Sequence, residues 1–136
     1  MFRLIIWFKP YSRYFLLGWV LFILVFSSLP SLPTIKIHTA KNEIRLDYFI
    51  HLVEYGILGV LAFLSYSGDR FRTGFRRFAV LTVCLIIFAF LDEFHQKYIP
   101  GRTFNPIDLY SNWTGIFVAL VFCVVVFRVL EGKDWH

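Results

Sequence analysis

The sequence predicts an all-α fold, an integral membrane bundle of four transmembrane helices with a polar pocket at its extracytoplasmic end. The first observation is composition: 58% of the 136 residues are hydrophobic and 17 are Phe, more apolar surface than a soluble domain of this size can bury. The second is that long apolar stretches alternate with short polar ones. The third is that three of these stretches reach membrane length only by including acidic and histidine residues. A single transmembrane domain over residues 1–136 is therefore expected.

The first helix is expected at about residues 14–29. Three basic residues precede it, so a cleavable signal peptide is the alternative interpretation. The apolar stretch is long for a signal peptide, and no small-residue cleavage site follows, which favours an uncleaved helix. Pro30 and Pro33 end this helix, and a polar loop is expected to continue to about Leu46.

The second helix is expected at about residues 47–66, and a loop with four arginines connects it to the third, at about residues 78–98. The uninterrupted apolar run 78–91 rises about 21 Å as a helix, against roughly 30 Å of hydrocarbon in a bilayer. The third helix can therefore span only by continuing into Asp92 and the polar residues after it. Charged groups at membrane depth are costly and mark a functional site by default.

The fourth helix is expected at about residues 107–130, because Pro106 suits a first helical turn and Pro100-Gly101 breaks the third helix. Gly115 is expected to be a close helix-packing position. With four spans, nine Lys and Arg residues lie on the side of the termini and five lie on the other side. The positive-inside rule then places the N- and C-termini in the cytoplasm.

The polar halves of the second, third and fourth helices all face the same side of the membrane in this arrangement. Asp47, His51 and Glu54 fall at i, i+4 and i+7, on one helical face. Asp108 and Asn112 repeat the i, i+4 spacing. The residues predicted to line the polar pocket are Asp47, His51, Glu54, Tyr55, Asp92, His95, Gln96, Arg102, Asp108 and Asn112.

Two kinds of site could be built from these residues. In a metal site, histidine and carboxylate groups would share a divalent cation. The sequence has no HExxH motif, so zinc is not favoured, and no other cofactor is predicted. In a metal-free catalytic site, His95 or His51 would act as acid or base. Asp92 would then orient His95, and Arg102 would hold a phosphate group.

Each of these polar residues also has a structural alternative. Asp47 and Asp108 stand near helix N-termini, where carboxylates cap free N–H groups. Arg102 can extend to lipid headgroups or pair with Asp92. Glu93 is expected to point away from Asp92 and to be solvated.

A longer pattern joins these residues. It comprises Asp47–His51, Glu54-Tyr55, Asp92-Glu93-Phe94-His95-Gln96, Pro100-Gly101-Arg102, Asp108, Asn112 and Gly115. The string resembles the VanZ-like family over roughly residues 44–128. The resemblance implies a multi-pass protein of the bacterial inner (cytoplasmic) membrane that serves the cell envelope. It also implies a link to antibiotic resistance, namely low-level resistance to teicoplanin-type glycopeptides.

The function expected from the resemblance and the polar pocket together is ligand handling at the outer leaflet. The ligand would be a membrane lipid, either a lipid-linked anionic cell-wall precursor or the lipid carrier undecaprenyl phosphate. The protein would bind or process this lipid, and whether it is an enzyme stays open. A nucleic acid partner is not expected.

The alternative is a non-enzymatic structural or partner-binding membrane protein, whose polar cluster is an interhelical hydrogen-bond network. Such bonds contribute only about 0.6 kcal/mol on average within membranes, so this many polar groups are a poor choice for stability alone. A proton or ion pathway is less favoured, because residues 116–126 contain no acidic or basic side chain.

Overall fold

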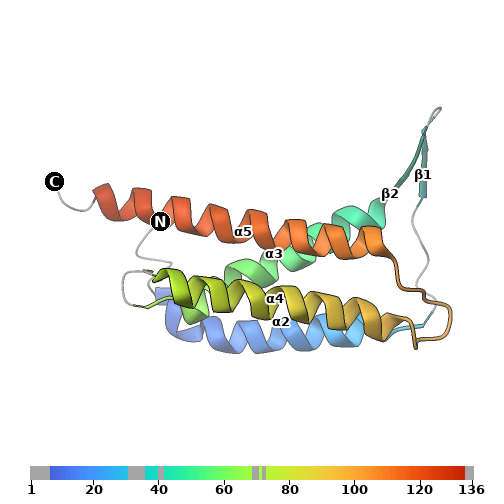
Figure 1. Cartoon of the computed structure of the whole chain (residues 1–136), viewed down its shortest axis with the longest axis horizontal. Helices are drawn as coiled ribbons and strands as arrows, with labels where there is room; N and C mark the ends of the chain where they lie inside the picture. The colour runs from blue at the N-terminus through green and yellow to red at the C-terminus, as the bar shows by residue number, and fades with distance from the viewer. Residues whose placement is uncertain (1–6, 31–35, 40–41, 69–70, 72, 134–136) are drawn as a thin grey trace.

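The computed structural model of the chain describes residues 7–30, 36–39, 42–68, 71 and 73–133. Its elements, in chain order, are η1 (Lys9–Tyr11), α2 (Ser12–Ser27), β1 (Lys36–Thr39), β2 (Asn42–Arg45), α3 (Leu46–Tyr66), α4 (Phe75–Gln96) and α5 (Pro106–Lys133). The helices α2, α4 and α5 run along the long axis of the molecule, and α3 crosses it obliquely (Figure 1). The expected all-α bundle is confirmed.

Four helices are long and apolar enough to cross a membrane. They are Lys9–Ser27, Leu46–Tyr66, Phe75–Gln96 and Pro106–Leu130. The four expected helices are therefore all present within the described residues, each within a few residues of its predicted bounds. This is the architecture of a multi-pass membrane protein.

The helices alternate in direction and so define two ends of the bundle (Figure 1). At the end called here the arginine end, α2 and α4 begin and α3 and α5 end, and this end carries Arg13, Arg76, Arg77 and Arg128. At the opposite end, called the hairpin end, α2 and α4 end and α3 and α5 begin. The polar halves predicted for three helices lie at the hairpin end, as expected.

A short antiparallel hairpin stands where the sequence predicted a plain polar loop. Strands β1 and β2 pair with Ile37 opposite Ile44, and the hairpin projects past the helix ends (Figure 1). Ile and Thr in this segment are β-branched and favour extended backbone. The prediction missed the hairpin because its strands have only four residues each, too short for a clear alternating pattern.

The closest helix pair is formed by α3 and α5, which cross through small residues. A Cβ added at Gly115 would lie 2.3 Å from the backbone oxygen of Leu52 and 3.0 Å from the nitrogen of Gly56. One turn further along, a Cβ on Gly59 would lie 3.0 Å from the Cβ of Ala119. The predicted role of Gly115 in close packing is confirmed, since only a hydrogen atom fits at this crossing.

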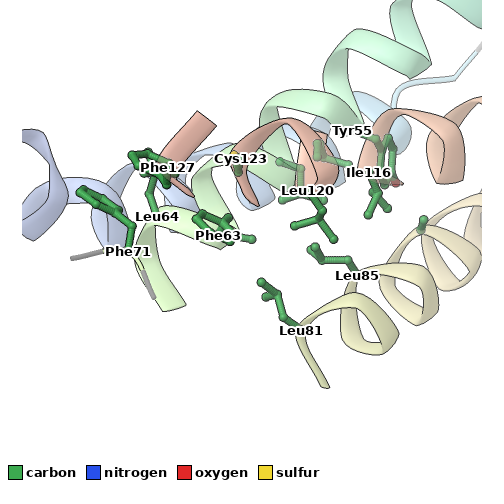
Figure 2. Packing of buried hydrophobic residues seen from close by; sticks show 14 of the residues in the cluster. Tyr55, Phe63, Leu64, Phe71, Leu81, Leu85, Ile116, Leu120, Cys123 and Phe127 are labelled. Carbon is green, nitrogen blue, oxygen red and sulfur yellow. The ribbon is translucent and has the colours of Figure 1, made fainter. Parts of the chain in front are cut away.

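The apolar core follows the bundle axis from Tyr55 to the arginine end (Figure 2). There the Phe127 ring stacks on Phe63 with 5.7 Å between ring centroids and on Phe71 with 4.1 Å. The Nζ of Lys9 lies 4.6 Å from the Phe71 centroid and donates to the backbone oxygen of Gly68. These contacts hold the α3–α4 loop against both α5 and the start of the chain's first long helix.

Replacement of Gly115 by alanine is expected to destabilise the bundle by about 1–3 kcal/mol, because the new methyl group overlaps the α3 backbone. The matched control is Gly18→Ala on α2, where an added Cβ meets nothing within 4 Å. Thermal unfolding in detergent micelles measures both variants. Equal melting temperatures for the two variants would show that α3 and α5 do not meet at this glycine.

Candidate functional site

Buried polar side chains gather at the hairpin end. Those at this end are Ser27, Glu54, Asp92, Glu93, Gln96, Asp108 and Asn112. They come from all four long helices, although each helix is mostly apolar. The sequence predicted the convergence of the second, third and fourth helices, but not Ser27 of α2 or the burial of Glu93. We refer to these residues together with His51, Tyr55, Arg102 and Asn105 as the polar cluster.

The carboxylate of Asp92 joins three helices. This side chain is 3% exposed. Its Oδ1 accepts a hydrogen bond from the Ser27 hydroxyl at 2.6 Å, and its Oδ2 accepts one from the Tyr55 hydroxyl at 2.8 Å. The acceptor is on α4 and the two donors are on α2 and α3, so Asp92 links these three helices. Lipid would offer these groups no alternative hydrogen-bond partners.

Arg102 closes the C-terminal end of α2. Its Nε donates to the backbone oxygen of Leu29 at 3.1 Å, and its Nη2 donates to that of Phe26 at 3.2 Å. Its Nη1 donates to Oε1 of Gln96 at 2.9 Å. A cation is favourable at a helix C-terminus. Arg102 lies at the polar end, as the sequence predicted, and stabilises the end of α2 there.

Glu93 and Asn105 connect α4 to the start of α5. The Oε1 of Glu93 accepts the backbone N–H of Asn105 at 2.9 Å. The side-chain amide of Asn105 donates to Oδ2 of Asp108 at 2.9 Å, and its oxygen accepts the backbone N–H of Ile107 at 3.1 Å. Asn105 therefore shapes the entry into α5, as asparagine often does at helix starts.

The expectation that Glu93 is solvated is wrong, because its side chain is 0% exposed. The buried face of α4 contains Ala89, Asp92, Glu93 and Gln96. Ala89 and Glu93 are four residues apart and so share one side of the helix. The inward face is thus centred between Asp92 and Glu93, and both carboxylates point into the bundle.

The same helical phase places His95 on the exposed side of α4. The predicted pairing of Asp92 with His95 is therefore corrected: both Asp92 oxygens are engaged by Ser27 and Tyr55 instead. Asp47, another predicted pocket residue, lies half-buried in the first turn of α3.

The sequence analysis offered either His51 or His95 as the histidine of the polar site. In the structure, His51 is the one that belongs to the cluster. It is half-buried on α3. Asp108, Asp92 and Arg102 all lie close enough to interact with it electrostatically. The structure thus brings together titratable groups from α3, α4 and α5, which the sequence prediction required.

Several buried atoms of the cluster have hydrogen-bonding capacity that the fold does not use. Within the described part of the chain, no hydrogen-bond partner in good geometry is found for Oε2 of Glu93, for Nδ1 of His51, or for either amide atom of Asn112, and the side chains of His51 and Asn112 lie within interaction distance of each other. Asn112 is 0% exposed. Buried polar groups are almost always paired, so unpaired ones require an explanation.

Most residues of the cluster fall into two groups, called here the paired half and the unpaired half. The paired half comprises Ser27, Tyr55, Asp92, Gln96 and Arg102, whose hydrogen bonds connect helices. The unpaired half comprises His51, Glu93 and Asn112, one from each of α3, α4 and α5. The unpaired half has fully buried atoms to spare for a ligand, and Arg102 of the paired half keeps one N–H on each terminal nitrogen.

The residues that sequence reasoning missed are Ser27, Glu93 and Asn105. Ser27 ends an apolar helix and carries no spacing relation to Asp92, so its partner depends on how α2 packs. Asn105 stands just before Pro106, and an Asn-Pro pair that opens a helix is a usable signal for a side-chain turn.

The predicted metal alternative finds no ligand set in the described residues. Among residues 7–30, 36–39, 42–68, 71 and 73–133, no group of three or more His, Cys, Asp or Glu side chains is arranged to hold a metal ion. The carboxyl groups of Asp92, Glu93 and Asp108 instead accept hydrogen bonds from hydroxyl and amide groups of the protein.

Fold and cluster together define a four-helix membrane-type bundle with a buried polar cluster at one end. The chain matches no protein-family profile, no curated protein sequence and no solved structure.

Loss of the Tyr55 hydroxyl in Tyr55→Phe is expected to cost about 0.6 kcal/mol and at most about 1.7 kcal/mol, the range for hydrogen bonds within membranes. Asp92→Ala is expected to cost more, about 1–3 kcal/mol for each donor left unpaired. Unfolding in detergent micelles measures both.

Ser65→Ala is the control for this pair, because the Ser65 hydroxyl bonds only within its own helix, to the oxygen of Leu61 at 2.7 Å. It is expected to change stability by a few tenths of a kcal/mol. If Asp92→Ala is as mild as Ser65→Ala, Asp92 does not hold the three helices together.

Proposed function

We propose that the chain is a VanZ-like protein of the bacterial cytoplasmic membrane that binds the polar headgroup of an envelope lipid at the outer leaflet. The support for the family is the set of residues that carry the resemblance. Asp92, Arg102, Asp108 and Asn112 come from separate segments, and all meet in the polar cluster.

The proposed orientation puts the arginine end in the cytoplasm and the hairpin end outside. Its support is the positive-inside rule. Arg13, Arg76, Arg77 and Arg128 stand at helix ends on the side assigned to the cytoplasm. The polar cluster then lies at the outer end of the bundle, on the side of the outer headgroup region.

The observation that carries the proposed binding is the unpaired half of the cluster. Each buried polar atom without a partner costs about 1–3 kcal/mol, and His51, Glu93 and Asn112 place such atoms on α3, α4 and α5 at the hairpin end. A ligand that supplies hydrogen-bond partners to these atoms recovers that cost and is bound correspondingly more tightly.

The charged side chains of the cluster determine the orientation that such a ligand would take. The interior of the cluster is acidic, because Glu54 and Glu93 each lie close enough to Asp92 to interact with it electrostatically. A phosphate is therefore expected at Arg102, whose protein bonds leave one N–H on each terminal nitrogen. Hydroxyl or amide groups of the headgroup would reach Glu93 and Asn112, which offer a carboxyl acceptor and an amide that both accepts and donates.

The purely structural alternative explains one half of the cluster. Interhelical bonding accounts for Asp92, Tyr55 and Arg102, whose partners are protein groups. It gives no reason for Glu93 and Asn112 to be buried with unpaired atoms, because apolar residues of similar shape would pack there without that cost.

Asn112→Leu is the sharpest test, because leucine has a similar shape and no polar atoms. We expect the melting temperature in detergent to stay the same or rise, since an unpaired amide is removed. Binding of undecaprenyl phosphate, followed by native mass spectrometry, is expected to fall at least tenfold, about 1.4 kcal/mol.

The matched control is Ser111→Ala, the neighbouring position on α5, whose hydroxyl bonds within the helix to Ile107 at 3.0 Å. It is expected to change neither melting nor binding. A large loss of stability in Asn112→Leu together with unchanged lipid binding would favour the structural network and contradict the proposed function.

A further inference from the structure

A second region of the molecule combines a cavity with positive charge, at the arginine end and away from the polar cluster. A cavity of about 630 Å³ opens there between the start of α4 and the last turns of α5. Its lining includes Phe63, Phe71, Phe78, Val124, Phe127 and Arg128. The volume lies within the range of about 300–1,000 Å³ that is usual for ligand sites.

The floor of this cavity is a fixed aromatic surface. Phe127 stacks between Phe63 and Phe71, and all three rings are buried (Figure 2). Phe71 holds this place although its backbone φ is 58°, a left-handed conformation that is unfavourable for a bulky residue. The ammonium group of Lys9 lies over the Phe71 ring and stabilises the aromatic stack by a cation–π contact.

The rim of the cavity is positively charged. Arg128 is the charged side chain among the lining residues, and it is exposed. Arg76 and Arg77 are exposed in the first turn of α4, directly after the lining residue Phe75. Gly74 precedes that turn without a capping side chain, so the positive end of the α4 dipole adds to the same field.

An apolar cavity beside cationic side chains at a helix end matches the two parts of an anionic phospholipid. An acyl chain suits the Phe and Val walls, and basic pockets between transmembrane helices bind acidic lipid headgroups. A zwitterionic lipid would place its own cation against Arg128. We propose that this cavity binds an anionic phospholipid of the membrane, with its phosphate at Arg128 and one acyl chain against Phe127 and Phe78.

The test compares phosphatidylglycerol with phosphatidylcholine of identical acyl chains, each titrated into the purified chain in detergent and counted as bound lipid by native mass spectrometry. Wild type is expected to prefer phosphatidylglycerol. Arg128→Gln is expected to reduce that preference about fivefold, the effect of one basic residue near an anionic headgroup. Arg13→Gln removes an exposed arginine at the same end that does not line the cavity, and it is expected to leave the preference unchanged.

The apolar part of the site is tested by filling it. Val124→Trp is expected to reduce the binding of both lipids. If this variant does not fold, Val125→Phe serves in its place, because Val125 also lines the cavity and is 54% exposed. Equal binding of the two lipids by wild type, an equal effect of Arg13→Gln and Arg128→Gln, or full binding by the filled variant would each overturn the proposal.

This site is independent of the proposed function at the hairpin end. Asn112→Leu, which is expected to weaken binding of undecaprenyl phosphate at the polar cluster at least tenfold, is expected to keep the preference for phosphatidylglycerol. Loss of that preference in Asn112→Leu would contradict a separate lipid site at the arginine end.

Discussion

The rest of the structure depends on the bonding of one carboxylate, that of Asp92. An acidic group on an apolar helix must find donors inside the bundle, because lipid offers none. The hydroxyls of Ser27 and Tyr55 meet both of its oxygens, and this fixes how α2 and α3 lie against α4. Arg102 then reaches the carbonyl groups at the end of α2, and α5 joins the bundle through the glycine crossing with α3.

The polar cluster contains two kinds of residue, those whose hydrogen bonds join helices and those with unpaired buried atoms. Residues whose hydrogen bonds join helices explain why the bundle has its shape, and they account for much of the charge in the cluster. Glu93 and Asn112 are buried beside them without contributing an equal number of bonds to the fold. Groups of this kind lower stability, and proteins keep such groups at sites where they meet a ligand.

Much of the fold could be predicted, because apolar length and proline breaks decide where membrane helices begin and end. The gathering of polar residues at one end followed from alternating helix direction. The sequence could not determine which side of α4 faces the interior of the bundle. An inward Asp92 is consistent with either Glu93 or His95 as its inward neighbour. Packing of Ala89 against the core selects Glu93. Ser27 was unpredictable, because its role depends on the position of α2 and not on its own sequence surroundings.

The most direct measurement is a crystal structure of the chain grown in a lipid phase that contains undecaprenyl phosphate. The account predicts lipid density with its phosphate at Arg102 and headgroup contacts to Glu93 and Asn112, while Asp92 keeps its bonds to Ser27 and Tyr55. A structure in which the Asn112 amide and the free Glu93 oxygen are bonded only to protein groups, with no lipid beside them, would contradict it.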